Sequence, residues 1–350
     1  MKKFAFFATL FFMAAFMLAG CKTESGEKAT SKKISVVVTI YPQYDWLKNI
    51  LGERFDAVNL KLLIKKGTDL HSYKPSAQDI ASIAGADMVV FVGGESDEWI
   101  KKALAATPKE GRITVNLMEA LGDRVKEEEV VEGMQAEDEH HHEGGEEAEE
   151  HEHHEHAETH EHEHHHHDEE VENDEHIWLS VINTKILVSR LAEALAQIDT
   201  ANAETYKTNA TNYTVKLNEL DNAYAAAVAQ ANNKTILFGD RFPFRYMVDD
   251  YGIKYFAAFV GCSAESEASF ETVTFLAGKM DSLSLPAIFT IEGGNGKIAR
   301  TILEASKKSK NAEILTLNSM QSVTDAQMKD GLDYLSIMQS NLDVLKKALK

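Results

Sequence analysis

The chain has 350 residues, of which 44% are hydrophobic, enough for two domains of ordinary size with a core each. Its formal net charge of −20 is concentrated in residues 127–175, which hold 23 Asp and Glu and no Lys or Arg. The rest of the chain carries 33 acids and 36 bases and is therefore close to neutral. A nearly neutral body without a basic patch excludes a nucleic-acid-binding protein.

The N-terminus has the pattern of a lipoprotein export signal. Two lysines precede an apolar run from Phe4 to Leu18, and small residues then lead to Cys21. This run is shorter than the ~20 residues of a membrane span, which favours an export signal over the alternative, a transmembrane anchor. We predict a signal peptide over residues 1–20, lipidation of Cys21 and a flexible tether over residues 21–33. The protein would then be extracytoplasmic, lipid-anchored to a bacterial membrane at the cell surface or in the periplasm.

Short strands and helices alternate from residue 34 onward. The β-branched run ISVVVTI is typical of a parallel strand that is buried on both faces. The alternation predicts βαβ units and a parallel sheet, and thus an N-terminal α/β lobe over residues 34–200. We expect strands over about 34–40, 57–64, 86–94 and 112–117, and helices over about 43–51, 78–84 and 97–106.

An acidic, histidine-rich segment over about residues 127–175 interrupts this lobe. It has almost nothing apolar to bury, so we expect a disordered loop. Imidazole suits zinc, copper and nickel, and the interleaved carboxylates add oxygen ligands, so the loop is predicted to collect metal. Its histidines are His140, His141, His142, His151, His153, His154, His156, His160, His162, His164, His165, His166 and His167.

The second half repeats the alternation after a helical region that begins at His176. Residues 201–232 contain no Pro or Gly and carry tyrosines and leucines at helical spacing. A helix of that length would be roughly 45 Å long and would form a rigid connector between two lobes. The C-terminal α/β lobe is then predicted over residues 233–350. In it we expect strands over about 234–239, 253–259, 286–293 and 312–318, and helices over about 244–252, 269–283, 295–308 and 325–349.

Few residues outside the loop suggest chemistry. His71 follows a strand, in a loop where ligands of parallel sheets often bind, and His176 lies where the acidic run meets an apolar helix. If Cys21 is lipidated, Cys262 has no disulfide partner and is either a small buried residue or a zinc ligand. The segment EGGNGK lacks the spacing of a phosphate loop, and no HExxH motif or nucleophile–base pair is present. We therefore do not expect an enzyme.

Two segments around these histidines have a recognisable pattern, GTDLHSYKPSAQDIASIAGADMVVFVGG around His71 and DEHIWLSVINTK around His176. They resemble the first and second metal-ligand motifs of the zinc- and manganese-specific solute-binding lipoproteins of bacterial ABC transporters, with Glu175 where proline is usual in the second. GDRFPFRYMVDDYGI is similar to the third motif, and the likeness covers about residues 34–350. The resemblance implies two α/β lobes with parallel sheets, joined by a long rigid helix, and a metal in the cleft between them. It implies His71 and His176 as ligands.

The resemblance does not settle the other ligands. The usual third position falls on Arg241, which cannot bind a metal because it is always protonated, so neighbouring Asp240 is the substitute we expect. The usual fourth position falls on Asn318, where water is an equal alternative. Cys262 is a further candidate. Glu267 occupies the position of a recurrent glutamate, and Arg241 is expected to pair with one of the carboxylates.

The function implied is high-affinity zinc capture outside the membrane and delivery to a membrane ABC permease by a monomeric protein. Two imidazoles and a carboxylate favour zinc over manganese, which remains the alternative metal. A surface metal store or adhesin remains the alternative function.

Overall fold

The computed structural model describes residues 33–65, 67–135, 172–263 and 267–349, and Ile34–Lys350 forms one compact unit. The predicted signal peptide, Cys21, nearly all of the predicted tether and all thirteen loop histidines lie outside the described residues. Among the described helices, none combines the length and the apolar composition that crossing a membrane requires.

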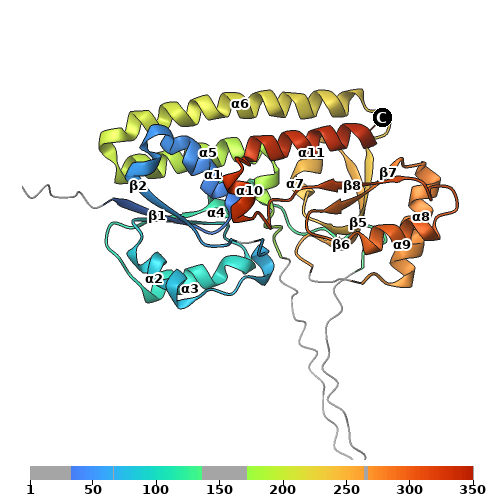
Figure 1. The fold of residues 1–350 in the computed structure, drawn as a ribbon, viewed down its shortest axis with the longest axis horizontal. Helices are drawn as coiled ribbons and strands as arrows, with labels where there is room; N and C mark the ends of the chain where they lie inside the picture. Colours follow the sequence, from blue (N-terminus) through green and yellow to red (C-terminus); the bar gives the residue numbers. More distant parts are fainter. Residues whose placement is uncertain (1–32, 66, 136–171, 264–266, 350) are drawn as a thin grey trace, which may run out of the picture. The chain divides into compact units, whose positions relative to one another are not determined.

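The N-terminal lobe is built on a four-stranded parallel sheet in the order β2-β1-β3-β4. Alternate residues of β1 face opposite cores. Val36 and Val38 pack into the large core with Trp46, and Val37 packs with Ile83 beneath α2 and α3. Figure 1 shows α2 and α3 on one face of this sheet and α1 and α5 on the other. The strands are β1 (Ile34–Val38), β2 (Val58–Leu62), β3 (Met88–Phe91) and β4 (Ile113–Asn116), and the helices are α1 (Tyr41–Leu51), α2 (Ala77–Gly85), α3 (Glu98–Ala106), α4 (Leu117–Leu121) and α5 (Val181–Ile198).

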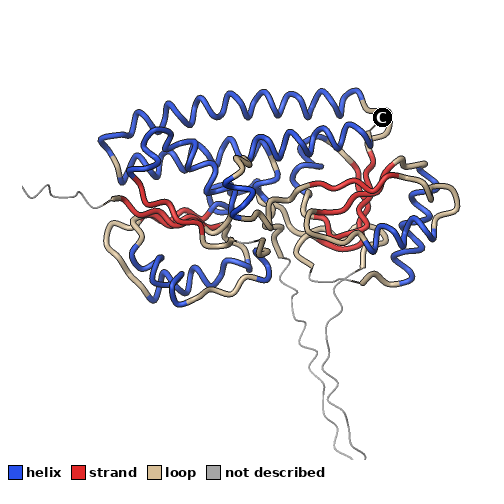
Figure 2. The backbone as a smooth tube through the Cα atoms, viewed as in Figure 1, coloured by secondary structure: helices blue, strands red, loops and turns tan. Residues whose placement is uncertain are grey.

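The C-terminal lobe repeats this design with a second four-stranded parallel sheet in the order β6-β5-β7-β8. The two groups of strands lie apart in Figure 2, each flanked by helices. The pairing of β5 with β6 shifts by one residue between Phe238 and Arg241, so Gly239 and Asp240 form a bulge. The strands are β5 (Thr235–Phe242), β6 (Lys254–Val260), β7 (Ala287–Ile291) and β8 (Glu313–Leu317), and the helices are α7 (Arg245–Tyr251), α8 (Phe270–Leu283), α9 (Lys297–Ala305), α10 (Asp325–Lys329) and α11 (Tyr334–Ala348).

The predicted connector is α6 (Ala203–Gln230), a helix of 28 residues that runs along both lobes. Asn209 of α6 donates to the carbonyl oxygen of Ile50 in α1 (2.9 Å), and the hydroxyl of Tyr224 donates to the carbonyl oxygen of Met338 in α11 (2.6 Å). The helix is thus fixed to elements at each end. The buried residues of α6 are Tyr206, Ala210, Tyr213, Leu217, Leu220, Tyr224 and Val228. The prediction of two α/β lobes with parallel sheets, joined by a long helix, is confirmed.

Two predicted boundaries are wrong. The C-terminal helix expected over 325–349 is divided into α10 and α11, because Gly331 adopts a positive φ of 89° and Asp333 caps the second helix with Ser336. The ends of the acidic loop are ordered and belong to the folded body. Glu127 forms an antiparallel bridge with Asn173, and the backbone nitrogen of residue 128 donates to the carbonyl oxygen of residue 172.

Candidate metal site

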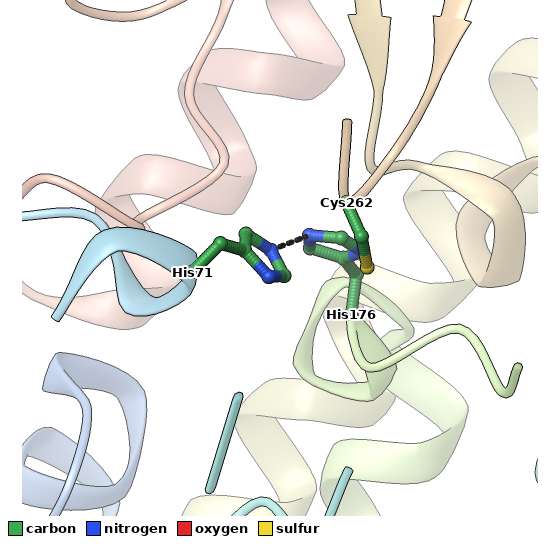
Figure 3. Close-up of side chains that lie close together, drawn as sticks. All are labelled: His71, His176 and Cys262. Atoms are coloured by element: carbon green, nitrogen blue, oxygen red, sulfur yellow. Dashed lines mark hydrogen bonds between the residues drawn. The ribbon is translucent and has the colours of Figure 1, made fainter. Parts of the chain in front are cut away.

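Three side chains of types that can bind a metal converge from distant parts of the chain (Figure 3). His71 lies on a 3-10 turn (Leu70–Ser72) after β2, His176 precedes α5, and Cys262 follows β6. Their ligand atoms all lie within 4.8 Å of one another, so among the described residues these three side chains form a group that could hold a metal ion. The Nε2 atoms of the two imidazoles are 3.2 Å apart. Two nitrogens bound to one tetrahedral zinc at about 2.0–2.1 Å would be roughly 3.3 Å apart.

His176 is fully buried, and its ring is fixed by Asp174. One carboxylate oxygen of Asp174 accepts from both the backbone nitrogen (2.8 Å) and the Nδ1 atom (2.9 Å) of His176. A hydrogen on Nδ1 leaves the lone pair on Nε2, facing His71. Gly261 makes room for this ring, since a Cβ atom there would be 2.9 Å from its Cε1 atom. Asp174 therefore holds the histidine itself, while Ser180 caps α5.

His71 is held by its own loop and by the neighbouring turn. The carboxylate of Asp69 accepts from the backbone nitrogen of His71 (3.0 Å) and caps the 3-10 turn. The Nδ1 atom of His71 lies 2.8 Å from the hydroxyl oxygen of Ser96. Burial lowers the pKa of His71, and the nearby imidazole of His176 lowers it further, so the pKa lies well below its usual range. The imidazole is therefore neutral at physiological pH, the state that binds metal.

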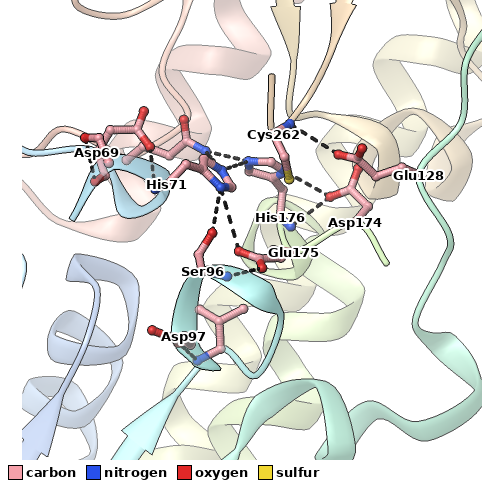
Figure 4. Close-up of polar contacts among 12 residues, drawn as sticks. Asp69, His71, Ser96, Asp97, Glu128, Asp174, Glu175, His176 and Cys262 are labelled. Carbon is pink, nitrogen blue, oxygen red and sulfur yellow. Dashed lines mark hydrogen bonds and ion pairs between the residues drawn. The ribbon is translucent and has the colours of Figure 1, made fainter. Parts of the chain in front are cut away.

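Cys262 lies in acidic surroundings (Figure 4). Its backbone nitrogen donates to the carboxylate of Glu128 (3.2 Å). Burial raises the pKa of its thiol, and the carboxylates of Glu128, Asp174 and Glu175 raise it further. A bound divalent cation would reverse this effect, because it stabilises the thiolate and interacts favourably with every one of these carboxylates.

A cleft of about 330 Å³ opens beside the cluster. His71 and Cys262 lie in its wall, and Glu172 and Asn173, at the end of the acidic segment, line it as well. Burial raises the pKa values of two of its glutamates, Glu128 and Glu175. This concentration of carboxylates makes the cleft wall acidic, which favours the entry of cations. The four acidic residues in its wall are Glu95, Glu128, Glu172 and Glu175.

Arg241 and Gln321 close the opposite side of the cluster. Arg241 forms an ion pair with Asp69, across the two lobes, and also donates to the side-chain oxygen of Gln321 (3.1 Å). The amide nitrogen of Gln321 therefore faces the Nε2 atoms of His176 (2.5 Å) and His71 (3.3 Å). The expected pairing of Arg241 with a carboxylate is present, but the partner is Asp69.

Gln321 is missing from the sequence-based list of candidates. It lies in the segment after β8, three residues beyond Asn318, and nothing in its sequence context marks it as a site residue. Its position beyond the carboxyl end of a parallel strand is the one available signal.

The remaining candidates lie apart from the cluster. Both oxygens of Asp240 accept from backbone nitrogens, those of Arg241 (2.9 Å) and Ile291 (3.2 Å). The bulge of β5 thus directs Asp240 toward β7. Glu267 is exposed and pairs with Lys297 (3.0 Å), which lowers the pKa of Glu267. The side-chain oxygen of Asn318 accepts from the backbone nitrogen of residue 320 (2.8 Å).

The structure thus combines two α/β lobes with parallel sheets, a long helix along both, and a cluster of side chains between the lobes that could hold a metal ion. Residues 36–348 match the family model of ZnuA, described as "Zinc-uptake complex component A periplasmic", and the chain belongs to this family. The resemblance seen in the sequence motifs is therefore confirmed.

Named relatives agree with this assignment. The chain is 32% identical to the "Zinc-binding lipoprotein AdcA" of Streptococcus pneumoniae, over 96% of this chain and 59% of the relative. It thus spans about three fifths of that longer protein. It is 28% identical to the "High-affinity zinc uptake system protein ZnuA" of Bacillus subtilis, over 97% of both chains. The crystal structure of the Zn(II)-bound ZnuA-like domain of Streptococcus pneumoniae AdcA superposes with a TM-score of 0.65 at 27% identity, over 91% of this chain and 99% of that domain.

Proposed function

We propose that this protein captures zinc outside the cytoplasmic membrane and delivers it to a membrane ABC permease. The observation that carries the proposal is the convergence of His71, His176 and Cys262, with two imidazole nitrogens 3.2 Å apart. The names of the relatives, which are zinc-binding and zinc-uptake proteins, support the same metal.

The proposed ligands are the Nε2 atoms of His71 and His176 and the thiolate of Cys262. Two neutral imidazoles and a thiolate form a borderline-soft set that suits zinc and disfavours manganese, which prefers oxygen ligands. Asp240, Glu267 and Asn318 are left out of the set, because their side chains have other partners. Water would fill a fourth position once the amide of Gln321 moves aside.

The thirteen histidines between residues 140 and 167 would collect zinc and raise its concentration near the cleft, since the acidic segment that carries them returns to the folded body at Glu172, in the cleft wall.

The predicted lipid at Cys21 would hold the monomeric protein at the membrane surface, close to its permease. The word "lipoprotein" in the name of the Streptococcus pneumoniae relative supports this anchoring. A surface store or adhesin is not favoured, because the curated relatives are named for zinc binding and uptake.

The experiment replaces residues 136–171 with a short Gly/Ser linker and measures zinc binding by competition with a chelator. The ordered segments up to Gln135 and from Glu172 are kept. We expect one tight site, which His71→Ala and His176→Ala each weaken at least about a hundredfold. Cells that depend on this protein should lose zinc uptake with either variant. A shortened protein without a tight site, or one that both variants leave unchanged, would contradict the proposal.

A further inference from the structure

The tripeptide Asp174-Glu175-His176 sends its two carboxylates in different directions (Figure 4). Asp174 contacts the histidine of its own segment, as described above. Glu175 instead reaches the 3-10 turn Glu95–Asp97 of the N-terminal lobe, where the backbone nitrogen of Ser96 donates to its Oε1 atom (2.8 Å). The same Ser96 contacts His71 through its hydroxyl.

The side chain of Glu175 is unusually buried for an acid at the end of a loop. It is only 2% exposed, and its Oε2 atom has no hydrogen-bond partner. That oxygen lies 3.8 Å from the Nδ1 atom of His71. Gly94 makes the space for this carboxylate, because a Cβ atom at Gly94 would lie 2.2 Å from its Oε1 atom. The structure therefore accommodates a buried acid specifically beside Ser96 and His71.

The hydrogen-bonding capacities of these groups give the contact a direction. His71 can offer the lone pair of Nε2 to a metal only if its hydrogen is on Nδ1. The hydroxyl oxygen of Ser96, at 2.8 Å, then accepts that hydrogen. The hydroxyl has one hydrogen of its own to donate, and the ionised carboxylate of Glu175 can only accept. The backbone nitrogen of Ser96 already holds Glu175 beside this hydroxyl. The order from His71 through the hydroxyl of Ser96 to the carboxylate of Glu175 is therefore the one that these donors and acceptors allow.

We infer that Glu175 is a positioning residue that acts through Ser96 to fix the tautomer and orientation of His71. One tripeptide then holds both metal-binding imidazoles, Asp174 directly and Glu175 through Ser96. This inference rests on the proposed function, since it needs His71 as a ligand. Proline, the usual residue at this place in the motif that the segment resembles, has no side chain that could act in this way.

The test uses the full chain and cobalt(II) as the probe. A thiolate bound to cobalt(II) gives a charge-transfer absorption, so this band reports Cys262 in the cluster and is silent for cobalt held by histidines and carboxylates elsewhere. Cys262→Ser should abolish the band, which identifies its source. The cobalt affinity is then read from the band in Glu175→Gln, Ser96→Ala and the double variant, with Asp174→Asn as the matched control.

We expect Glu175→Gln and Ser96→Ala each to weaken cobalt binding about tenfold or more, the usual cost of losing a partner of a metal-binding histidine. The double variant should bind cobalt no more weakly than the single variant with the lower affinity, because both changes break the same chain of contacts from Glu175 through Ser96 to His71. Asp174→Asn acts on the other imidazole, so its effect should multiply with that of Glu175→Gln. Ser96→Thr, which keeps the hydroxyl, should retain most of the affinity.

Two results would overturn the inference. One is an unchanged affinity in Glu175→Gln, and the other is a double variant whose loss equals the product of the two single losses. If Glu175→Gln fails to fold, Ser96→Ala and Ser96→Thr decide the matter, since equal affinities in these two would exclude a role for the hydroxyl. A wild-type chain without any thiolate band would instead contradict the proposed ligand set.

Discussion

Cys262 is the residue on which the metal preference of the proposed site depends. In the absence of a cation its thiol stays protonated, because burial and three nearby carboxylates raise its pKa. A divalent metal between His71 and His176 removes that penalty and gains a soft ligand. An oxygen donor at the same place would make the set harder and more suitable for manganese.

Replacement of the thiol therefore gives the first prediction. In the chain that lacks residues 136–171, Cys262→Ser should weaken zinc binding about tenfold or more, because a neutral hydroxyl is a poor zinc ligand. Asp240→Ala is the control and should change the affinity less than about twofold, since both oxygens of Asp240 are engaged by backbone nitrogens. Competition titration measures both. The reverse order of effects would assign the third ligand to Asp240.

The side chain of Gln321 points its NH2 group, which cannot bind a metal, toward the two imidazoles. Arg241 holds the carbonyl oxygen, so the NH2 group points at the two imidazoles, and its nitrogen has no lone pair available for coordination. The amide thus satisfies the imidazoles in the metal-free state, and it must move when an ion binds.

A carboxylate at this position leads to the second prediction. Gln321→Glu should tighten zinc binding by about tenfold, because one oxygen can bind the metal while the other accepts from Arg241. Gln321→Ala, which only removes the amide, should stay within about threefold of the wild type. Both affinities come from the same competition titration. A weaker affinity in Gln321→Glu would show that this side chain does not reach the metal.

At the level of elements, the donors come from turns that follow parallel strands or precede a helix. The β-branched runs of the sequence predict those strands well, because a strand buried on both faces must be apolar throughout. The break before α11 was beyond prediction, since Gly331 lies in an otherwise helical pattern and its positive φ is set by the tertiary structure. The ordered ends of the acidic loop were missed for a similar reason. Two of their acids, Asp174 and Glu175, are buried, and Glu175 is held by a contact with a distant segment, at Ser96.

The turn after β3 contains a second buried acid, Asp97, which gives the third prediction. Burial, with a smaller contribution from the nearby charge of Glu175, raises the pKa of Asp97 to about 7. The folded chain therefore keeps a proton on Asp97 that the unfolded chain has already lost. This contribution to stability is fully present below about pH 4 and disappears as the pH rises to about 7.

The measurement compares the wild type with Asp97→Asn, which keeps an oxygen to accept from the backbone nitrogen of Val92. The free energy of unfolding of the metal-free wild type, relative to the variant, should fall with pH by up to roughly 1.4 kcal/mol per pH unit between pH 4 and 7. Urea unfolding at several pH values gives this difference, in which groups common to both chains cancel. A difference that is constant, or that grows with pH, would contradict the assignment.

At the scale of the whole molecule, the cluster exists only because two lobes meet. His71 belongs to one lobe and Cys262 to the other, and the Asp69–Arg241 ion pair joins the lobes beside them. The alternation of strands and helices predicts each lobe separately, and the α6 connector follows from a long stretch without Pro or Gly. The choice among Asp240, Cys262 and Glu267 as the third ligand could not be made from spacing, because it depends on the bulge in β5 and on where the lobes touch.

X-ray absorption at the zinc edge measures directly whether Cys262 binds zinc together with the two histidines. The sample is the chain without residues 136–171, loaded with less than one equivalent of zinc so that only the tight site is filled. We expect two imidazole nitrogens at about 2.0–2.1 Å and one sulfur at about 2.3 Å from the metal, with the sulfur lost in Cys262→Ser. A shell of nitrogen and oxygen alone in the wild type would contradict it.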